Sequence, residues 1–199
     1  MLKLLAPTKA ELMFKNSRFV AEATPVNSPD EARALWKYRK DTYDNGGHIV
    51  YAFITGSGGN IMGCSDDGEP SGTAGRPVLA VLKGSNITNA IITIARYFGG
   101  TKLGTGGLVH AYGESAKAAL AEARTAPLTI QSSLSLVLPY NLYSQCRKLL
   151  EENSFEFTGE NFTDCVHING VIARSELEKT IKFLKELSGD KIMVDFKDL

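Results

Sequence analysis

The chain has 199 residues, 43% of them hydrophobic, and its 22 basic and 22 acidic side chains leave no formal net charge. This length fits one large or two small domains with ordinary cores. The balanced charge excludes a strongly basic protein that binds nucleic acid mainly through its net positive charge. No apolar run is long enough to span a bilayer and no leader pattern opens the chain, so residence in the cytoplasm without membrane contact is expected.

The first part of the chain mixes strands with one helix. Residues 16–24 have a strand-like composition. Ser28-Pro-Asp-Glu31 is a capping box with proline at the first helical position, which predicts a helix from there to about Tyr43. Residues 48–54 and 60–63 are expected to pair across the glycine-rich turn between them.

Two glycine-dense loops follow, at residues 63–75 and 99–107, and each leads into a helical pattern. The apolar run 90–98 between them is expected to be a buried strand. Glycine loses more backbone freedom on folding than any other residue, so such loops indicate positive φ angles or close backbone approach. Because the free amides at a helix start attract anions, we expect the two loops to converge on one cleft that suits a phosphate-type anion.

These loops also carry a family resemblance. The strings Ser65-Asp-Asp-Gly-Glu-Pro-Ser-Gly-Thr-Ala-Gly-Arg-Pro77 and Ala95-Arg-Tyr-Phe-Gly-Gly-Thr-Lys-Leu-Gly-Thr-Gly-Gly-Leu108, with Ala111-Tyr112, resemble the signature of the IMPACT/YigZ family. The chain departs from that pattern at two places. It reads His48-Ile-Val-Tyr-Ala52 where the family typically has His-Asn-Cys-Tyr-Ala, and His110 stands where lysine or arginine is common.

The resemblance implies a fold and a role in translation. The N-terminal domain would have the superfold of several ribosomal proteins and of the fourth domain of elongation factor G, a mixed sheet with a left-handed βαβ crossover. The chain would be a bacterial two-domain member, a branch whose function is uncharacterised. Eukaryotic relatives restrain a stress-responsive translation-control kinase by binding its activator, which implies a role in translation regulation.

After Ala126-Pro127 the pattern changes to the order βαββαβ, which predicts a ferredoxin-like sandwich. Its expected strands are 134–138, 155–160, 164–173 and 192–196, and its expected helices are 141–152 and 176–187. Ser175 with Glu178 is expected to cap the second of these helices, and Gly189 to end it. The fold class is therefore α+β, with an IMPACT-type domain at residues 1–126 and a ferredoxin-like domain at residues 127–199.

The zero net charge conceals a difference between these two domains. Residues 1–126 hold 14 Lys and Arg against 11 Asp and Glu, whereas residues 127–199 hold 8 against 11. Repulsion between like charges opposes contact of an acidic domain with a phosphate backbone. We therefore expect the N-terminal domain to be the one that meets an anionic partner.

The candidate ligand-binding residues lie in the two loops and on the strand between them. Arg96 is the foremost of them, because a guanidinium at the end of a buried strand must be paired or face a bound anion. Lys102 is interpreted either as a phosphate contact or as a solvated loop lysine. The expected cleft residues are Asp66, Asp67, Glu69, Thr73, Gly75, Arg96, Lys102, Gly104, Gly106 and Gly107.

The three carboxylates of the first loop have two interpretations. Asp66 and Asp67, with Glu69, could bind a divalent cation, although their spacing is not that of an EF-hand. An equally good interpretation is that Asp66 or Asp67 accepts loop amides or pairs with Arg76 or Arg96. We therefore assign no metal or other cofactor, and Asp66 and Asp67 are the expected ligands if a divalent cation binds.

Candidate catalytic groups are few. His48 and His110 are possible acid/base residues, but an isolated histidine is more often structural. Tyr97, Phe98 and Tyr112 could stack on a base or belong to the core. The three scattered cysteines form no metal or disulfide pattern, and Cys64 has no identifiable base partner. Nothing amounts to a catalytic set, so an enzyme is the less favoured interpretation.

Two functions remain open. The first is a non-catalytic binding module or regulator associated with translation, which contacts protein, ribosome or RNA through the N-terminal domain. The alternative is an enzyme or sensor for a small phosphorylated or nucleotide ligand, held by the two glycine-rich loops.

Overall fold

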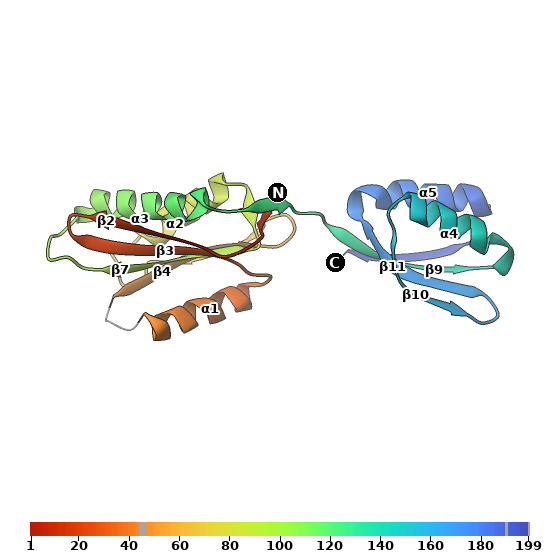
Figure 1. The fold of residues 1–199 in the computed structure, drawn as a ribbon, viewed down its shortest axis with the longest axis horizontal. Helices are drawn as coiled ribbons and strands as arrows, with labels where there is room; N and C mark the ends of the chain where they lie inside the picture. Colours follow the sequence, from red (N-terminus) through yellow and green to blue (C-terminus); the bar gives the residue numbers. More distant parts are fainter. Residues whose placement is uncertain (44–46, 190, 199) are drawn as a thin grey trace. The chain divides into compact units, whose positions relative to one another are not determined.

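The computed structural model describes residues 1–43, 47–189 and 191–198. The chain forms two compact units, Met1–Leu128 and Thr129–Leu199, and each is described by itself. Figure 1 shows that each unit is built from a sheet with helices packed on it. The expected boundary after residue 126 lies two residues before the end of the first unit.

A five-stranded antiparallel sheet forms the centre of the N-terminal unit. Its strand order is β2-β3-β7-β4-β5. The strands are β2 (Thr8–Phe14), β3 (Ser17–Pro25), β4 (His48–Thr55), β5 (Ile61–Ser65) and β7 (Ala90–Tyr97). The four strands that the sequence predicts are present within about two residues of their expected ends. Strand β2, which was not predicted, lies at the edge of the sheet, where every second residue faces solvent.

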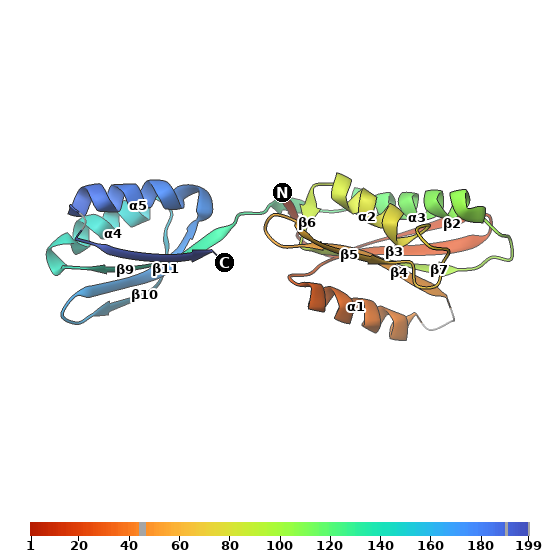
Figure 2. The same cartoon turned by 180° about the vertical axis from the view of Figure 1, so that it is seen from behind.

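Helices cover both faces of this sheet, as Figures 1 and 2 show. Helices α2 (Gly75–Gly84) and α3 (Gly104–Ala121) pack on one face, over a core that includes Phe19, Ile92 and Tyr112. Helix α1 (Pro29–Thr42) packs on the other face through Trp36. The indole nitrogen of Trp36 donates to the carbonyl of Ile49 at 2.7 Å, which ties α1 to strand β4.

The start of α1 confirms the predicted cap. Ser28 has extended backbone angles, and its hydroxyl accepts from the amide of Glu31 at 3.1 Å. The Glu31 carboxylate returns a bond to the amide of Asn27 rather than to that of Ser28. The first bond satisfies an amide that the helix leaves unpaired, and the second ties the residue before the cap to the first turn.

A second, small sheet closes one end of the N-terminal unit, in the order β6-β1-β8. Strand β1 (Leu2–Leu4) pairs in parallel with β6 (Ile87–Thr88) and antiparallel with β8 (Thr125–Pro127). Residues 126 and 127, expected at the domain boundary, are therefore held in the N-terminal unit.

The C-terminal unit has the predicted βαββαβ order. Its antiparallel sheet has the order β10-β11-β9-β12, and both helices lie on one face (Figure 1). The elements are β9 (Gln131–Leu138), a 3-10 turn (Tyr140–Leu142), α4 (Tyr143–Glu152), β10 (Glu156–Phe162), β11 (Val166–Ala173), α5 (Arg174–Ser188) and β12 (Met193–Asp198). Buried leucine and isoleucine side chains, among them Leu136, Leu150 and Ile168, fill the space between the sheet and the helices.

Two expected helix starts are wrong. Helix α5 begins at Arg174, so Ser175 lies inside it and does not cap it, whereas Gly189 ends it with φ +57° as predicted. Helix α3 begins at Gly104 rather than at Leu108. The glycines of its first turn have a low helix propensity, so the sequence does not indicate a helix there.

Candidate functional site

A cleft of about 700 Å³ opens at one end of the N-terminal unit. Strands β4 and β7, the first glycine-rich loop and the start of α3 form its walls. We call it the Arg96 cleft. Its lining residues are Gly47, His48, Glu69, Pro70, Arg96, Tyr97, Phe98, Lys102, Leu103, Gly104, Thr105 and Leu108. The two glycine-rich loops therefore meet at one site, as the sequence predicts, although the second loop is shorter than expected because α3 begins early.

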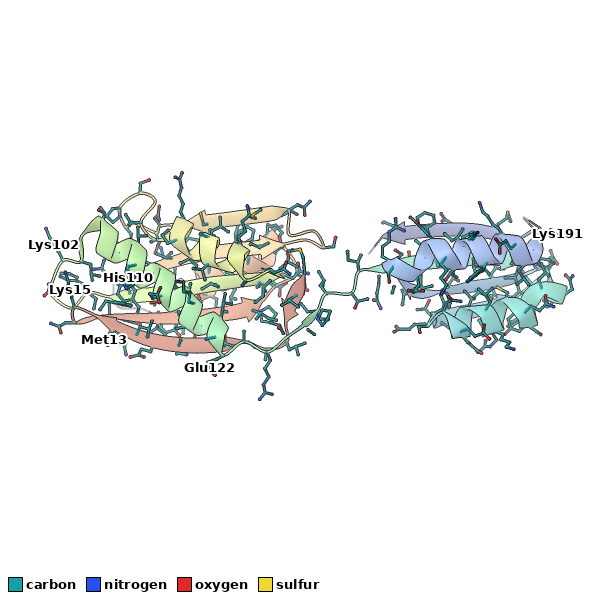
Figure 3. All side chains as sticks on the ribbon, turned by 90° about the horizontal axis from the view of Figure 1, so that it is seen from above. Met13, Lys15, Lys102, His110, Glu122 and Lys191 are labelled. Atoms are coloured by element: carbon teal, nitrogen blue, oxygen red, sulfur yellow. The ribbon has the colours of Figure 1, made fainter. Side chains whose placement is uncertain are left out.

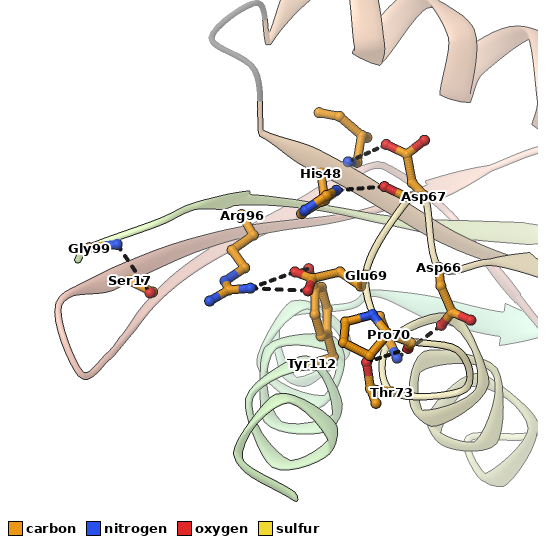
Figure 4. A network of polar contacts seen from close by, with 12 residues as sticks. Ser17, His48, Asp66, Asp67, Glu69, Pro70, Thr73, Arg96, Gly99 and Tyr112 are labelled. Carbon is orange, nitrogen blue, oxygen red and sulfur yellow. Dashed lines mark hydrogen bonds and ion pairs between the residues drawn. The ribbon is translucent and has the colours of Figure 1, made fainter. Parts of the chain in front are cut away.

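Arg96 lies in this cleft with only 9% of its surface exposed. One of its terminal nitrogens donates to both carboxylate oxygens of Glu69, at 2.8 and 3.1 Å (Figure 4). Its Nε atom is buried and finds no hydrogen-bond partner among the described residues. An unpaired buried donor is costly, so Glu69 alone does not satisfy the guanidinium.

Glu69 is held from a second side by Tyr112. The Tyr112 hydroxyl donates to the Glu69 carboxylate at 2.7 Å. Burial, together with the adjacent Glu69 carboxylate, raises the pKa of Tyr112 far above its ordinary value, so the hydroxyl keeps its proton. This triad of Arg96, Glu69 and Tyr112 links strand β7, the first loop and helix α3.

His48 lies directly opposite Arg96 across the β4–β7 pair. Its Nδ1 atom lies 2.6 Å from the carbonyl oxygen of Asp67. A carbonyl only accepts, so Nδ1 carries a proton, and Nε2 is the nitrogen left for another partner. Figure 4 shows this arrangement beside the triad.

The three acidic residues of the first loop point to three different partners. Asp66 accepts from the amides of Gly72, Ala74 and Gly75 at 2.8, 3.0 and 2.8 Å. Asp67 accepts from the amide of Ile49 at 2.7 Å and pairs with Lys40. Among the described residues no group of acidic, histidine or cysteine side chains is arranged to hold a metal ion. The loop-amide interpretation therefore describes Asp66, whereas Asp67 bonds to strand β4 and helix α1 instead.

The Asp66 carboxylate occupies the amides that lead into helix α2. Burial disfavours its charged form, but the hydrogen bonds from Gly72, Gly75 and Ala74 and the charge of Arg76 outweigh this, so the pKa of Asp66 is lowered. A second anion has no room there. The expectation that both helix starts suit a phosphate is therefore wrong for α2, because the chain supplies its own anion.

Helix α3 differs, because among the described residues no side chain caps its start. Gly104 has φ +74°, and Gly104, Thr105 and Gly106 are exposed. Figure 3 shows Lys102 at the end of the unit where this helix begins. The free amides, the exposed Lys102 and Arg96 together form a polar wall with positive character.

Several expected cleft residues lie elsewhere. The Thr73 hydroxyl donates to the Pro70 carbonyl at 2.7 Å, and Gly75 packs against the backbone of Ser65, so both serve the loop itself. Gly106 and Gly107 lie in the first turn of α3 and do not line the cleft. His110 is exposed further along α3, with its ring 5.7 Å from that of Phe14 (Figure 3).

The environments of Cys64 and of the aromatic candidates limit what these side chains can do. Burial, followed by the nearby Asp66 charge, raises the pKa of the Cys64 thiol, which disfavours the reactive thiolate. Of the three aromatic stacking candidates, Tyr97, Phe98 and Tyr112, Tyr112 is fully buried, whereas Phe98 is 60% exposed. None of the described helices combines the length and apolar character needed to cross a bilayer.

Comparisons with known proteins assign the family. The Impact N-terminal domain matches residues 15–120. An IMPACT family member from Haemophilus influenzae is 30% identical over 204 residues, which cover 100% of this chain and 99% of that protein. IMPACT family member YigZ from Escherichia coli is 34% identical over 147 residues, which cover 73% of this chain and 72% of YigZ. A crystal structure of a hypothetical protein has a TM-score of 0.72 at 28% identity, with 97% of this chain and 95% of that chain covered. The chain therefore belongs to the IMPACT family, as the motifs of its glycine-rich loops indicate.

Proposed function

We propose that this protein is a non-catalytic RNA-binding module associated with translation, and that the Arg96 cleft takes a phosphate of the RNA. The observation that carries the proposal is the buried Arg96, whose Nε atom lacks a partner among the described residues, beside the uncapped start of α3. Both groups favour an anion. The association with translation rests on the family resemblance.

The electrostatics of the cleft set the strength of this binding. Glu69 neutralises much of the Arg96 charge, since the two groups form a close ion pair. The remaining attraction comes from the exposed Lys102 and from the amides of α3. We therefore expect weak, salt-sensitive binding with few phosphate contacts rather than a tight electrostatic grip.

A titration of the full chain with a short single-stranded oligoadenylate tests the proposal. The logarithm of the binding constant should fall with the logarithm of salt concentration by about 0.7 for each phosphate contact. Lys102→Ala should reduce this slope by about 0.7, the value for the loss of one phosphate contact. Lys83→Ala is the matched control, because Lys83 is exposed in the last turn of α2, about 12 Å along the helix from its start. Salt-independent binding, or equal effects of the two substitutions, would contradict the proposal.

Separate expression of residues 1–128 and 129–199 assigns the binding to one unit. We propose that each fragment unfolds cooperatively and that only the N-terminal fragment binds the oligonucleotide, in keeping with its excess of basic residues. Binding by residues 129–199 alone would overturn this assignment. Binding of a protein partner with no RNA affinity in either fragment would replace the RNA proposal with a protein-binding one.

A sensor of a small phosphorylated ligand is the second candidate. The observation that favours it is the cleft volume of about 700 Å³, which lies within the range of small-molecule sites. A sensor should bind a mononucleotide as tightly as the oligonucleotide.

A further inference from the structure

Phe98 projects at the Arg96 cleft without belonging to a core. It follows the last residue of β7, and 60% of its surface is exposed. The Arg96 guanidinium carbon lies 5.6 Å from the centre of its ring. We propose that the cleft reads a nucleotide by stacking the base on Phe98 while the phosphate contacts the start of α3. This inference rests on the proposed function and names the ligand class, a nucleoside phosphate, free or within single-stranded RNA.

The phosphate side of this site combines the uncapped start of α3 with a guanidinium that Glu69 satisfies only in part. Helix α3 has 18 residues and, among the described side chains, none that caps it or adds acidic charge to its first turn. A Cβ added at Gly104 or Gly106 would meet no atom within 4 Å, so the backbone there is open to a ligand. Arg96 supplies the second, independent feature, because its side chain is nine-tenths buried and its Nε atom is unpartnered among the described residues.

The base side requires an aromatic surface next to that anion site. Stacking on an aromatic ring is favourable for every base, because every base has a π face. Phe98 provides this surface, and Pro70, Leu103 and Leu108 add apolar wall to the same cleft. A partner that presented only phosphates, such as a phosphorylated protein segment, would leave this apolar surface unused.

The comparison with helix α2 supports the assignment of the phosphate to α3. At α2 the Asp66 carboxylate already takes three amides, and no residue of α2 lines the cleft. At α3 the helix start, Lys102 and Phe98 all belong to the lining of the cleft. Only the second helix start combines anion binding with a surface for a base.

Binding of AMP, ribose 5-phosphate and inorganic phosphate to the full chain, measured by calorimetry, tests the inference. AMP should bind about 5- to 150-fold more tightly than ribose 5-phosphate, the range expected from one base stacked on an aromatic ring. Phe98→Ala and Phe98→Leu should both remove this difference and leave ribose 5-phosphate binding unchanged. Tyr38→Ala is the matched control, because Tyr38 lies on α1 and is 63% exposed.

The outcomes separate this inference from the proposed function. Equal affinity for AMP and ribose 5-phosphate, or no effect of Phe98→Ala on AMP, would overturn base stacking, while Lys102-dependent RNA binding would still support the proposed function. If AMP, ribose 5-phosphate, inorganic phosphate and the oligoadenylate all fail to bind, both the inference and the proposed function are overturned. A short oligoadenylate that binds more tightly than AMP and loses affinity with Phe98→Ala identifies the strand as the source of the nucleotide, whereas equal affinities identify the free nucleotide.

Discussion

The two glycine-rich loops of this protein have similar glycine content but different structural roles. The first loop folds over the start of α2, where Asp66 accepts three backbone amides. The second loop leads to the start of α3 and leaves it uncapped by any described side chain. One helix start is thus satisfied by a carboxylate of its own loop, whereas the other has no side-chain cap among the described residues.

The difference shows how similar glycine content can arise from different constraints. At Gly75 a Cβ would meet the backbone of Ser65 at 2.8 Å, so glycine there permits close packing of the loop on itself. At Gly104 the backbone has φ +74° with open space around it, so glycine there permits an unusual conformation. Composition records the glycine in both places but not which constraint requires it.

The largest effect is expected from Glu69→Ala. This substitution tests whether Glu69 of the first loop also limits anion binding in the Arg96 cleft. Removing Glu69 leaves Arg96 as an uncompensated buried charge and should lower the free energy of unfolding by about 4 kcal/mol. If the variant folds, freeing Arg96 should tighten binding of inorganic phosphate. Urea denaturation and phosphate titration measure the two effects. Glu11→Ala is the control, since its pair with Arg18 is exposed and should contribute less than about 1 kcal/mol.

A somewhat smaller loss, about 3 kcal/mol, is expected for Gly99→Ala in the second loop. The added Cβ would overlap the backbone of Asn16 and Ser17 in the turn between β2 and β3. Either that turn or the end of β7 must then move, together with the wall of the Arg96 cleft. Thermal unfolding and oligonucleotide binding should therefore both be impaired. A stable variant with unchanged binding would show that the second loop is not held by this contact.

Asp66→Ala should destabilise the protein by about 2 kcal/mol, the upper end for loss of a helix-capping group, because three amides lose their acceptor. The folded-state pKa of Asp66 is lowered, so its stabilising effect is present above the unfolded pKa of about 4 and is lost as pH falls through the folded value. The wild-type protein should thus lose more stability than the variant in acid. Parallel pH dependence of the two unfolding curves would argue against the capping role.

The smallest effect is expected for Gly106→Ala, which serves as a counterpart to Gly99→Ala. Gly106 is helical, and a Cβ there would meet no atom within 4 Å. Alanine should raise the free energy of unfolding by about 0.4–1 kcal/mol, mainly because it restricts the unfolded chain. Denaturation midpoints would reveal this gain. A loss of stability would indicate that the first turn of α3 is packed more tightly than its open surroundings imply.

Much of the fold is predictable because local patterns and tertiary packing agree. The run ending at Tyr97 consists largely of β-branched and small apolar residues, and it forms the central strand β7. The alternation of strands and helices after residue 127 likewise gives the C-terminal topology. Strands β1, β6 and β8 have only two or three residues and depend on long-range pairing, so no local pattern indicates them.

The residues of the site are predictable, but only some of their partners are. Arg96, Lys102 and the convergence of the loops follow from motif and position, and acceptance of loop amides by Asp66 is one of the expected interpretations. The pairing of Glu69 with Arg96 and Tyr112 depends on the path of the first loop, which brings together side chains 27 and 43 residues apart in the sequence. Phe98 and Tyr112 are both aromatic residues in motif strings, and only packing separates the buried side chain from the exposed one.

The position of Trp36 has a practical consequence for spectroscopy. It is the single tryptophan of the chain, and it lies between α1 and the central sheet of the N-terminal unit, with its indole bonded to Ile49. Emission excited at the red edge of tryptophan absorption therefore reports on that unit alone, whereas far-ultraviolet circular dichroism reports on both. Separate midpoints in the two signals would resolve the two units in the intact chain, without an added label.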